Sequence, residues 1–246
     1  MITTLTPTLN EWIELPLRPK AKVIGLNETH ILLDANDELA GKTVIVSIKL
    51  NKRMKERVTG KAIAEGPTMQ VFIMSYCPFG AQFVKGLLPV WKKFKDKANI
   101  ELRFVSYTMH GQKEEEENKR MICIREEQSS KLIPYLECFY FGTGNADECI
   151  KEVGINKAKL DSCMESRAEN YFEKDKELNE LYGVRGSPTV VIDGNTVEIW
   201  PRSPENIKEK LCEFFKEKPN ECYENLSNKN PSPGFGGGES ERGGFC

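Results

Sequence analysis

Short apolar runs separated by turn-forming residues characterise residues 1–66. Lys22–Ile24 and His30–Leu33 flank the turn-like stretch Gly25–Glu28, and Thr43–Leu50 is a third run of the same kind. Apolar runs of this length, bounded by Gly, Asn and Asp, are typical of β-strands. The pattern therefore predicts a small β-rich module at the start of the chain.

A larger unit is predicted over residues 67–222. Met69–Ser75 is a continuous apolar run that predicts a buried strand, and Ile100–Tyr107 alternates apolar and polar residues as a second strand does. Between them, Gly80–Lys97 has the pattern of a helix that we expect to be interrupted at Pro89. The unit thus opens in the order strand, helix, strand.

The second half of this unit begins with a long charged stretch, residues 110–182, whose pattern is helical. Thr189–Ile192, the turn Asp193–Asn195 and Thr196–Trp200 then predict a β-hairpin, and Pro204–Lys216 predicts a closing helix. The complete order is β-α-β, a helical insertion, and β-β-α. The predicted fold class is therefore α/β, with the element order of a thioredoxin-like fold.

The last segment, residues 223–246, is rich in Gly, Ser, Asn and Pro and low in apolar residues. Such a composition buries too little apolar surface to offset the entropy of ordering, so we expect a flexible tail.

Composition narrows the classes of partner. Charged residues make up 29% of the chain but balance to a net charge of −2, which gives no electrostatic reason to expect nucleic acid. No run approaches the 18 or so apolar residues of a membrane span, and Met1–Thr4 lacks the start of a signal peptide. We expect no membrane insertion in this chain.

Cys77 is the residue most indicative of chemistry. It follows the strand predicted at Met69–Ser75 and precedes the predicted helix, so its sulfur should lie at a helix N-terminus. The positive end of the helix dipole favours a thiolate there, which makes the cysteine a nucleophile. Gly80 occupies the position where a Cys-x-x-Cys motif has its second thiol. This predicts chemistry by a single thiol.

A proline loop precedes the predicted hairpin. In thioredoxin-like proteins the segment corresponding to Gly186–Thr189 is a cis-proline loop that faces the active cysteine. Its exposed backbone edge is suited to pairing with a substrate chain in β fashion. We expect Pro78, Phe79, Ser187 and Pro188 to contact substrate.

The other cysteines favour disulfides over a metal site. Their spacing lacks the Cys-x2-Cys pairs of zinc sites, and the two histidines, His30 and His110, lie far apart in sequence. Structural bridges are expected among Cys123, Cys138, Cys149 and Cys163, in any of three pairings, and between Cys212 and Cys222. Disulfides imply an extracytoplasmic compartment or the cytoplasm of a hyperthermophile. We expect no metal and no cofactor.

Two motifs of the larger unit resemble known families. Ser75-Tyr76-Cys77-Pro78-Phe79-Gly80 is similar to the Ser-Tyr-Cys-Pro-Tyr-Gly motif of extracytoplasmic DsbA-like proteins. His110-Gly111, Glu114, Asn118 and Cys123 reproduce the spacing of gamma-interferon-inducible lysosomal thiol reductase, although Thr108 and Glu115 stand where that family has cysteines. Apart from this resemblance, Glu114–Glu117 is expected to be a solvated helix start, and His110 a surface or capping residue.

The first module resembles the last part of an FKBP-type prolyl isomerase of the SlyD kind. The similarity is carried by Val23-Ile24, by Leu32–Asn36 and by Leu39–Val44, with Asp37-Glu38 in place of that family's His-Pro. The front half that forms the isomerase pocket is missing from these residues. The resemblance implies either a small packing module or a residual isomerase or chaperone role.

Together these features predict a thiol-disulfide oxidoreductase or isomerase with Cys77 as nucleophile. Its partners would be unfolded or disulfide-containing proteins and an unidentified redox partner. Cys246, on the predicted flexible tail, is a possible resolving thiol. The rivals are a redox-silent chaperone or scaffold, a prolyl isomerase lacking its catalytic half, and an iron-sulfur protein with one thiol ligand.

Overall fold

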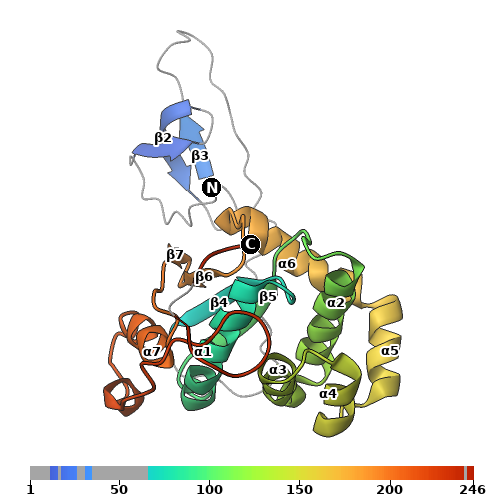
Figure 1. Cartoon of the computed structure of the whole chain (residues 1–246). Helices are drawn as coiled ribbons and strands as arrows, with labels where there is room; N and C mark the ends of the chain where they lie inside the picture. The colour runs from blue at the N-terminus through green and yellow to red at the C-terminus, as the bar shows by residue number, and fades with distance from the viewer. Residues whose placement is uncertain (1–11, 16–17, 27–30, 35–65, 241–242) are drawn as a thin grey trace. The chain divides into compact units, whose positions relative to one another are not determined.

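The computed structural model describes residues 12–15, 18–26, 31–34, 66–240 and 243–246. The chain forms two compact units, residues 1–61 and 62–246 (Figure 1). The second unit includes the segment that the sequence predicts to be a separate flexible tail.

The first unit contains a three-stranded antiparallel sheet. Its strands are β1 (Trp12–Leu15), β2 (Arg18–Leu26) and β3 (Ile31–Asp34), with β2 in the centre. The strands predicted around residues 22–24 and 30–33 lie in β2 and β3. The strand predicted at 43–50, and most of the isomerase-like motif, lie outside the described residues.

The second unit is built on a four-stranded sheet in the order β5-β4-β6-β7. Central β4 (Thr68–Ile73) pairs in parallel with β5 (Asn99–Phe104) and antiparallel with β6 (Thr189–Ile192), which continues into the edge strand β7 (Asn195–Val197). Asp193 and Gly194 have φ angles of 46° and 80° and form the two-residue turn of this hairpin.

Two helices flank the sheet in the thioredoxin-like order. Helix α1 (Pro78–Phe94) connects β4 to β5, and α7 (Pro204–Cys212) follows β7. The interruption predicted at Pro89 is wrong: α1 runs through this residue. The proline forfeits one backbone hydrogen bond, whereas the helix buries Leu87, Leu88, Val90 and Phe94 around it. Burial of this apolar face outweighs the lost bond.

Five helices and a short 3-10 turn form the insertion between β5 and β6 (Figure 1). They are α2 (Gln112–Glu127), η1 (Ser129–Lys131), α3 (Leu132–Phe141), α4 (Ala146–Val153), α5 (Lys157–Ser166) and α6 (Ala168–Tyr182). Local sequence sets their starts: the Asn145 side chain accepts from Glu148 N at the start of α4, and Asn156 accepts from Lys159 N at the start of α5. Together with the central sheet, the insertion completes a thioredoxin-like α/β fold.

The segment 223–246 is the main correction to the predicted fold. Its described residues run across α1, as the dark red trace in Figure 1 shows, and are held by hydrogen bonds to the fold. Gly234 N donates to Pro78 O at 2.8 Å, and buried Lys85 donates through Nζ to Gly236 O at 2.8 Å. A short 3-10 turn, η2 (Asn220–Tyr223), leads into this segment.

One aromatic side chain anchors the same segment. The Phe235 ring lies 5.2 Å from the ring of Phe139 and 5.5 Å from that of Tyr76, in edge-to-face geometry. The composition predicted flexibility because apolar residues are few. In the structure, the Phe235 ring and backbone hydrogen bonds hold this segment against the fold.

None of the described helices has the length and apolar character that a membrane crossing requires.

Candidate active site at Cys77

Cys77 is the N-cap of α1. Its Sγ accepts a hydrogen bond from Gly80 N at 3.3 Å, and Pro78 occupies the first helical position, which favours a helix start. The residue is fully buried. Peptide dipoles therefore point their positive end at the sulfur, and in the reduced state this arrangement stabilises a thiolate.

The proline loop faces this cysteine. The peptide bond Ser187-Pro188 is cis, and Ser187 is buried, with its Oγ accepting a hydrogen bond from Met74 N at 2.9 Å. The loop directly precedes β6, which pairs with β4. The sheet thus holds the loop beside the end of the strand that leads to Cys77.

Cys246 lies between the two. It forms a disulfide with Cys77, with 6.0 Å between the Cα atoms. Its backbone also pairs with Ser187: Cys246 N donates to Ser187 O at 2.9 Å, and Ser187 N donates to Cys246 O at 3.1 Å. This reciprocal pair is the hydrogen-bonding pattern of an added antiparallel strand.

The structure gives a steric reason for Gly80. A Cβ atom at this position would lie 2.6 Å from Ser187 Oγ and 3.2 Å from Met74 O. Because the Ser187 hydroxyl is held by its bond to Met74 N, a cysteine at position 80 requires the loop to shift. The partner sulfur comes from the far end of the sequence instead.

The other six cysteines, which the sequence predicts to form structural bridges, are paired in three further disulfides. Cys123–Cys163 joins α2 to α5, Cys138–Cys149 joins α3 to α4, and Cys212–Cys222 joins α7 to η2. All eight cysteines are described, and none is free.

Residues of the insertion motif hold the loop that precedes Cys77. Glu114 Oε2 accepts from Tyr76 N at 3.2 Å, and Asn118 Oδ1 accepts from Ser75 N at 3.1 Å. His110 Nδ1 lies 2.6 Å from Glu114 Oε2. The expectation of a solvated helix start is wrong for Glu114, which is fully buried because its oxygens serve these backbone N–H groups.

Glu117, one turn further on, is also buried, again contrary to expectation. It accepts a hydrogen bond from Tyr135 OH at 2.6 Å and pairs with Arg120. Burial raises the pKa of the Glu117 carboxyl to about 7, although Arg120 acts in the opposite direction. The insertion therefore places a proton-binding group in the core behind the active-site loop.

Arg202 was not identified from the sequence. It lies just after β7, is almost fully buried, and donates from Nη2 to Gly244 O at 2.6 Å and from Nη1 to Gln82 Oε1 at 3.0 Å. Burial lowers the pKa of its guanidinium to about 10. Arginine is normally a surface residue, so no signal in the neighbouring sequence indicates this burial.

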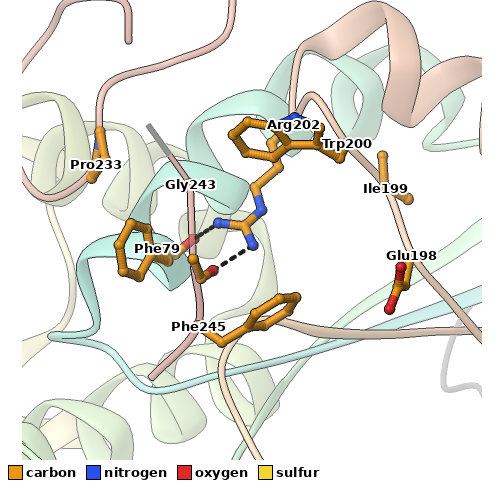
Figure 2. A pocket seen from close by; sticks show the side chains of 9 residues that line it. Phe79, Glu198, Ile199, Trp200, Arg202, Pro233, Gly243 and Phe245 are labelled. Carbon is orange, nitrogen blue, oxygen red and sulfur yellow. Dashed lines mark hydrogen bonds between the residues drawn. The ribbon is translucent and has the colours of Figure 1, made fainter. Parts of the chain in front are cut away.

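A groove of about 770 Å³ is lined by Phe79, Arg202 and the tail residues 243–245 (Figure 2). Figure 2 shows the Arg202 side chain reaching between Phe79 and Phe245, with Trp200 next to it and Glu198 and Ile199 on the opposite wall. Of the residues predicted to contact substrate, Phe79 lines this groove and Ser187 pairs with Cys246. Pro78 O is occupied by Gly234 N.

Among the described residues, no cluster of three His, Cys, Asp or Glu side chains has the arrangement of a metal site.

Comparisons with known proteins identify the fold. No protein-family model matches the sequence, and no curated protein matches it significantly. Among solved structures, oxidised BdbD from Bacillus subtilis superposes with a TM-score of 0.50 at 16% identity, covering 61% of this chain and 88% of BdbD. The structural neighbours are DsbA-like proteins of the thioredoxin fold.

Two further neighbours come from Mycobacterium tuberculosis. Reduced DsbA has a TM-score of 0.49 at 17% identity and covers 63% of this chain and 85% of its own. The reduced disulfide bond oxidoreductase DsbG has a TM-score of 0.49 at 18% identity and covers 63% and 81%. The comparisons support neither the narrower resemblance to the lysosomal thiol reductase nor the one to the prolyl isomerase.

Proposed function

We propose that this protein catalyses thiol-disulfide exchange on protein substrates, with Cys77 as the nucleophile and Cys246 as the resolving thiol. One observation carries the proposal: Cys246 is disulfide-bonded to the N-cap cysteine of α1 while its backbone pairs with Ser187. A resolving thiol must reach the attacking sulfur, and Cys246 does so.

The reaction starts from the reduced protein. The Cys77 thiolate attacks one sulfur of a substrate disulfide, and the other substrate sulfur leaves as a thiolate that takes up a proton. Cys246 then loses its proton to solvent, its thiolate attacks the Cys77 sulfur, and the second substrate sulfur leaves as a thiolate that takes up a proton. The substrate has gained two electrons and two protons, and Cys77 and Cys246 have lost them by forming their disulfide. An external thiol reductant restores the dithiol.

The same groups support two related reactions. Run in reverse, the Cys77–Cys246 disulfide oxidises a substrate dithiol. If a thiol of the substrate attacks the mixed disulfide before Cys246 does, the substrate is isomerised without net oxidation. The partners are therefore disulfide-containing proteins together with a thiol or disulfide redox partner. Four disulfides in one chain favour an oxidising, extracytoplasmic setting.

Removing the two sulfurs one at a time tests the proposal. We expect C77S to lose insulin reduction and repair of scrambled ribonuclease down to the uncatalysed level. C246S should still attack substrate but accumulate a mixed disulfide on Cys77, visible by mass spectrometry, because only a thiol from outside the chain can then release the substrate.

A redox-silent binding protein gives a different result. In that case the wild type would suppress aggregation without reducing insulin, and C77S would suppress it equally well. Identical mixed-disulfide yields in the wild type and C246S would contradict the resolving role of Cys246 while leaving Cys77 as nucleophile.

A further inference from the structure

We propose that the groove formed by Phe79, Trp200 and Arg202 is a substrate subsite for the three residues that precede the reactive cysteine of a polypeptide. It selects an extended segment of the form glycine-glycine-aromatic-cysteine, which Gly243–Cys246 imitates. This inference rests on the proposed function and names the substrate class of the same site.

Backbone contacts define the register of the segment. The cysteine position is fixed by the reciprocal hydrogen bonds between Cys246 and Ser187. Two residues earlier, the carbonyl of Gly244 accepts the 2.6 Å bond from Arg202 Nη2. These contacts use main-chain groups that any polypeptide carries, and the buried cation makes the carbonyl contact charge-assisted. A foreign chain therefore satisfies them equally well.

Side-chain walls impose the selection. A Cβ atom at Gly244 would lie 2.7 Å from the Phe79 ring, and one at Gly243 would lie 2.0 Å from the Trp200 ring. Residues two and three places before the cysteine must therefore be glycine, unless these rings move. The Phe79 ring limits the side chain at position 244 and the Trp200 ring limits the one at position 243, so the preference for glycine at each position can be tested separately.

The residue directly before the cysteine meets a different surface. The Phe245 ring lies with its centroid 5.2 Å from the Arg202 guanidinium carbon and remains 66% exposed. Arg202 is also within 6 Å of the rings of Phe79 (5.9 Å) and Trp200 (5.7 Å). An aromatic side chain at this position gains a cation–π contact, and its exposure leaves room for other shapes.

Peptides carrying an activated cysteine test the subsite in the full-length C246S protein, which has a free Cys77 thiol. Acetyl-Gly-Gly-Phe-Cys-amide, linked through its sulfur to nitrothiobenzoate, reacts when the Cys77 thiolate forms a disulfide with the peptide and expels the coloured nitrothiobenzoate. The comparison peptides are Gly-Val-Phe-Cys and Val-Gly-Phe-Cys, which place valine two or three residues before the cysteine. The free disulfide of nitrothiobenzoate, which has no peptide backbone to pair with Ser187 or Arg202, reports the intrinsic reactivity of Cys77.

We expect Gly-Gly-Phe-Cys to react at least about tenfold faster than either valine peptide, the equivalent of one lost favourable contact. W200A should remove most of the penalty for valine three residues before the cysteine and leave the penalty for valine two residues before it. R202K should slow all peptides about tenfold relative to the reaction with the small disulfide. K157Q, which removes an exposed cation on α5, should change neither rate.

Two failures are distinguishable. Equal rates for the three peptides, with normal reactivity toward the small disulfide, would overturn the subsite and leave the proposed function intact. Rates no faster than those of free cysteine toward every reagent would overturn the proposed function itself.

A variant of the tail tests the imitation independently of Arg202. In G244V/C246S, the valine collides with the Phe79 ring, so the tail should leave the groove and the Gly-Gly-Phe-Cys peptide should react severalfold faster than in C246S. An unchanged or slower rate would contradict occupancy of the substrate position by the tail.

Discussion

The tail and the helical insertion are both fastened by disulfides, but the sulfurs have different surroundings. In the insertion, Cys123 lies in the middle of α2 and Cys163 within α5, and both are buried between helices. In the tail bridge, Cys77 caps α1 and receives the Gly80 N–H. The first arrangement offers no stabilisation to a thiolate, whereas the second does. We therefore predict that position on a helix separates a structural bridge from a reactive one.

Loop length alone predicts how strongly each bridge stabilises the fold, and it says nothing of reactivity. The entropy model gives about 5 kcal/mol for the 169-residue separation of Cys77 and Cys246, and about 4 kcal/mol for the 40-residue separation of Cys123 and Cys163. By this measure the tail bridge stabilises the fold most. The helix N-terminus opposes it by stabilising the reduced form.

The largest effect is expected from the insertion. C123A/C163A should lower the free energy of unfolding by about 4 kcal/mol because the unfolded chain regains the entropy of the open loop. Urea unfolding measures this change. Reaction of Cys77 with a small disulfide, measured where the variant is still folded, should be unaffected. A loss of Cys77 reactivity in the folded variant would erase the distinction between the two regions.

The next effect concerns Glu117 and pH. Because burial raises its pKa from 4.5 to about 7, the folded protein retains a proton that the unfolded chain releases within this window. The free energy of unfolding should therefore fall as pH rises from about 4.5 to 7, by at most about 3 kcal/mol. E117Q should flatten this slope in denaturant titrations. The exposed neighbour serves as control: a slope that E116Q changes as much as E117Q would exclude this assignment.

A smaller effect is expected where the insertion contacts the loop that precedes Cys77. E114Q replaces one carboxylate oxygen by an NH2 group that cannot accept, so the backbone N–H of either Tyr76 or Met109 loses its acceptor, at a cost of about 2 kcal/mol. It should also slow exchange at Cys77, since the loop before the cysteine loses an anchor. The stability is measured by unfolding and the rate by peptide exchange. E115Q, at an exposed position next to it, should do neither.

The smallest effect is a difference in reduction rate. Dithiothreitol should open Cys77–Cys246 at least about tenfold faster than the other bridges, because a stabilised Cys77 thiolate is the better leaving group. Timed alkylation followed by mass spectrometry ranks the bridges. If Cys212–Cys222 opened first, the proposed reactivity of the tail bridge would not stand.

The sequence predicted most of the second unit because its signals are local. Three short segments each predict a nearby strand, turn or loop: the apolar run before Cys77, Asp193-Gly194 and Ser187-Pro188. It failed where the outcome depends on distant partners. Glu114 is acidic in a run of glutamates, and only the nearby backbone of the active-site loop explains its burial.

Arg202 and the tail show the same limit. Nothing in the residues around Arg202 indicates that its guanidinium is buried against Gly244 O. A Gly-rich segment with few apolar residues is typical of disorder, yet here the lack of side chains lets Gly243 and Gly244 lie against aromatic rings. Close approach of backbone to ring is a tertiary property, which composition cannot express.

The tail disulfide also makes the redox state a matter of chain connectivity. No other bridge crosses the residues between Cys163 and Cys212, since Cys123–Cys163 lies before this stretch and Cys212–Cys222 after it. A single cut there leaves two fragments that are covalently joined only while Cys77 and Cys246 are bonded. On a denaturing gel, the nicked protein would run as one band when Cys77 and Cys246 are bonded and as two bands when that bond is reduced.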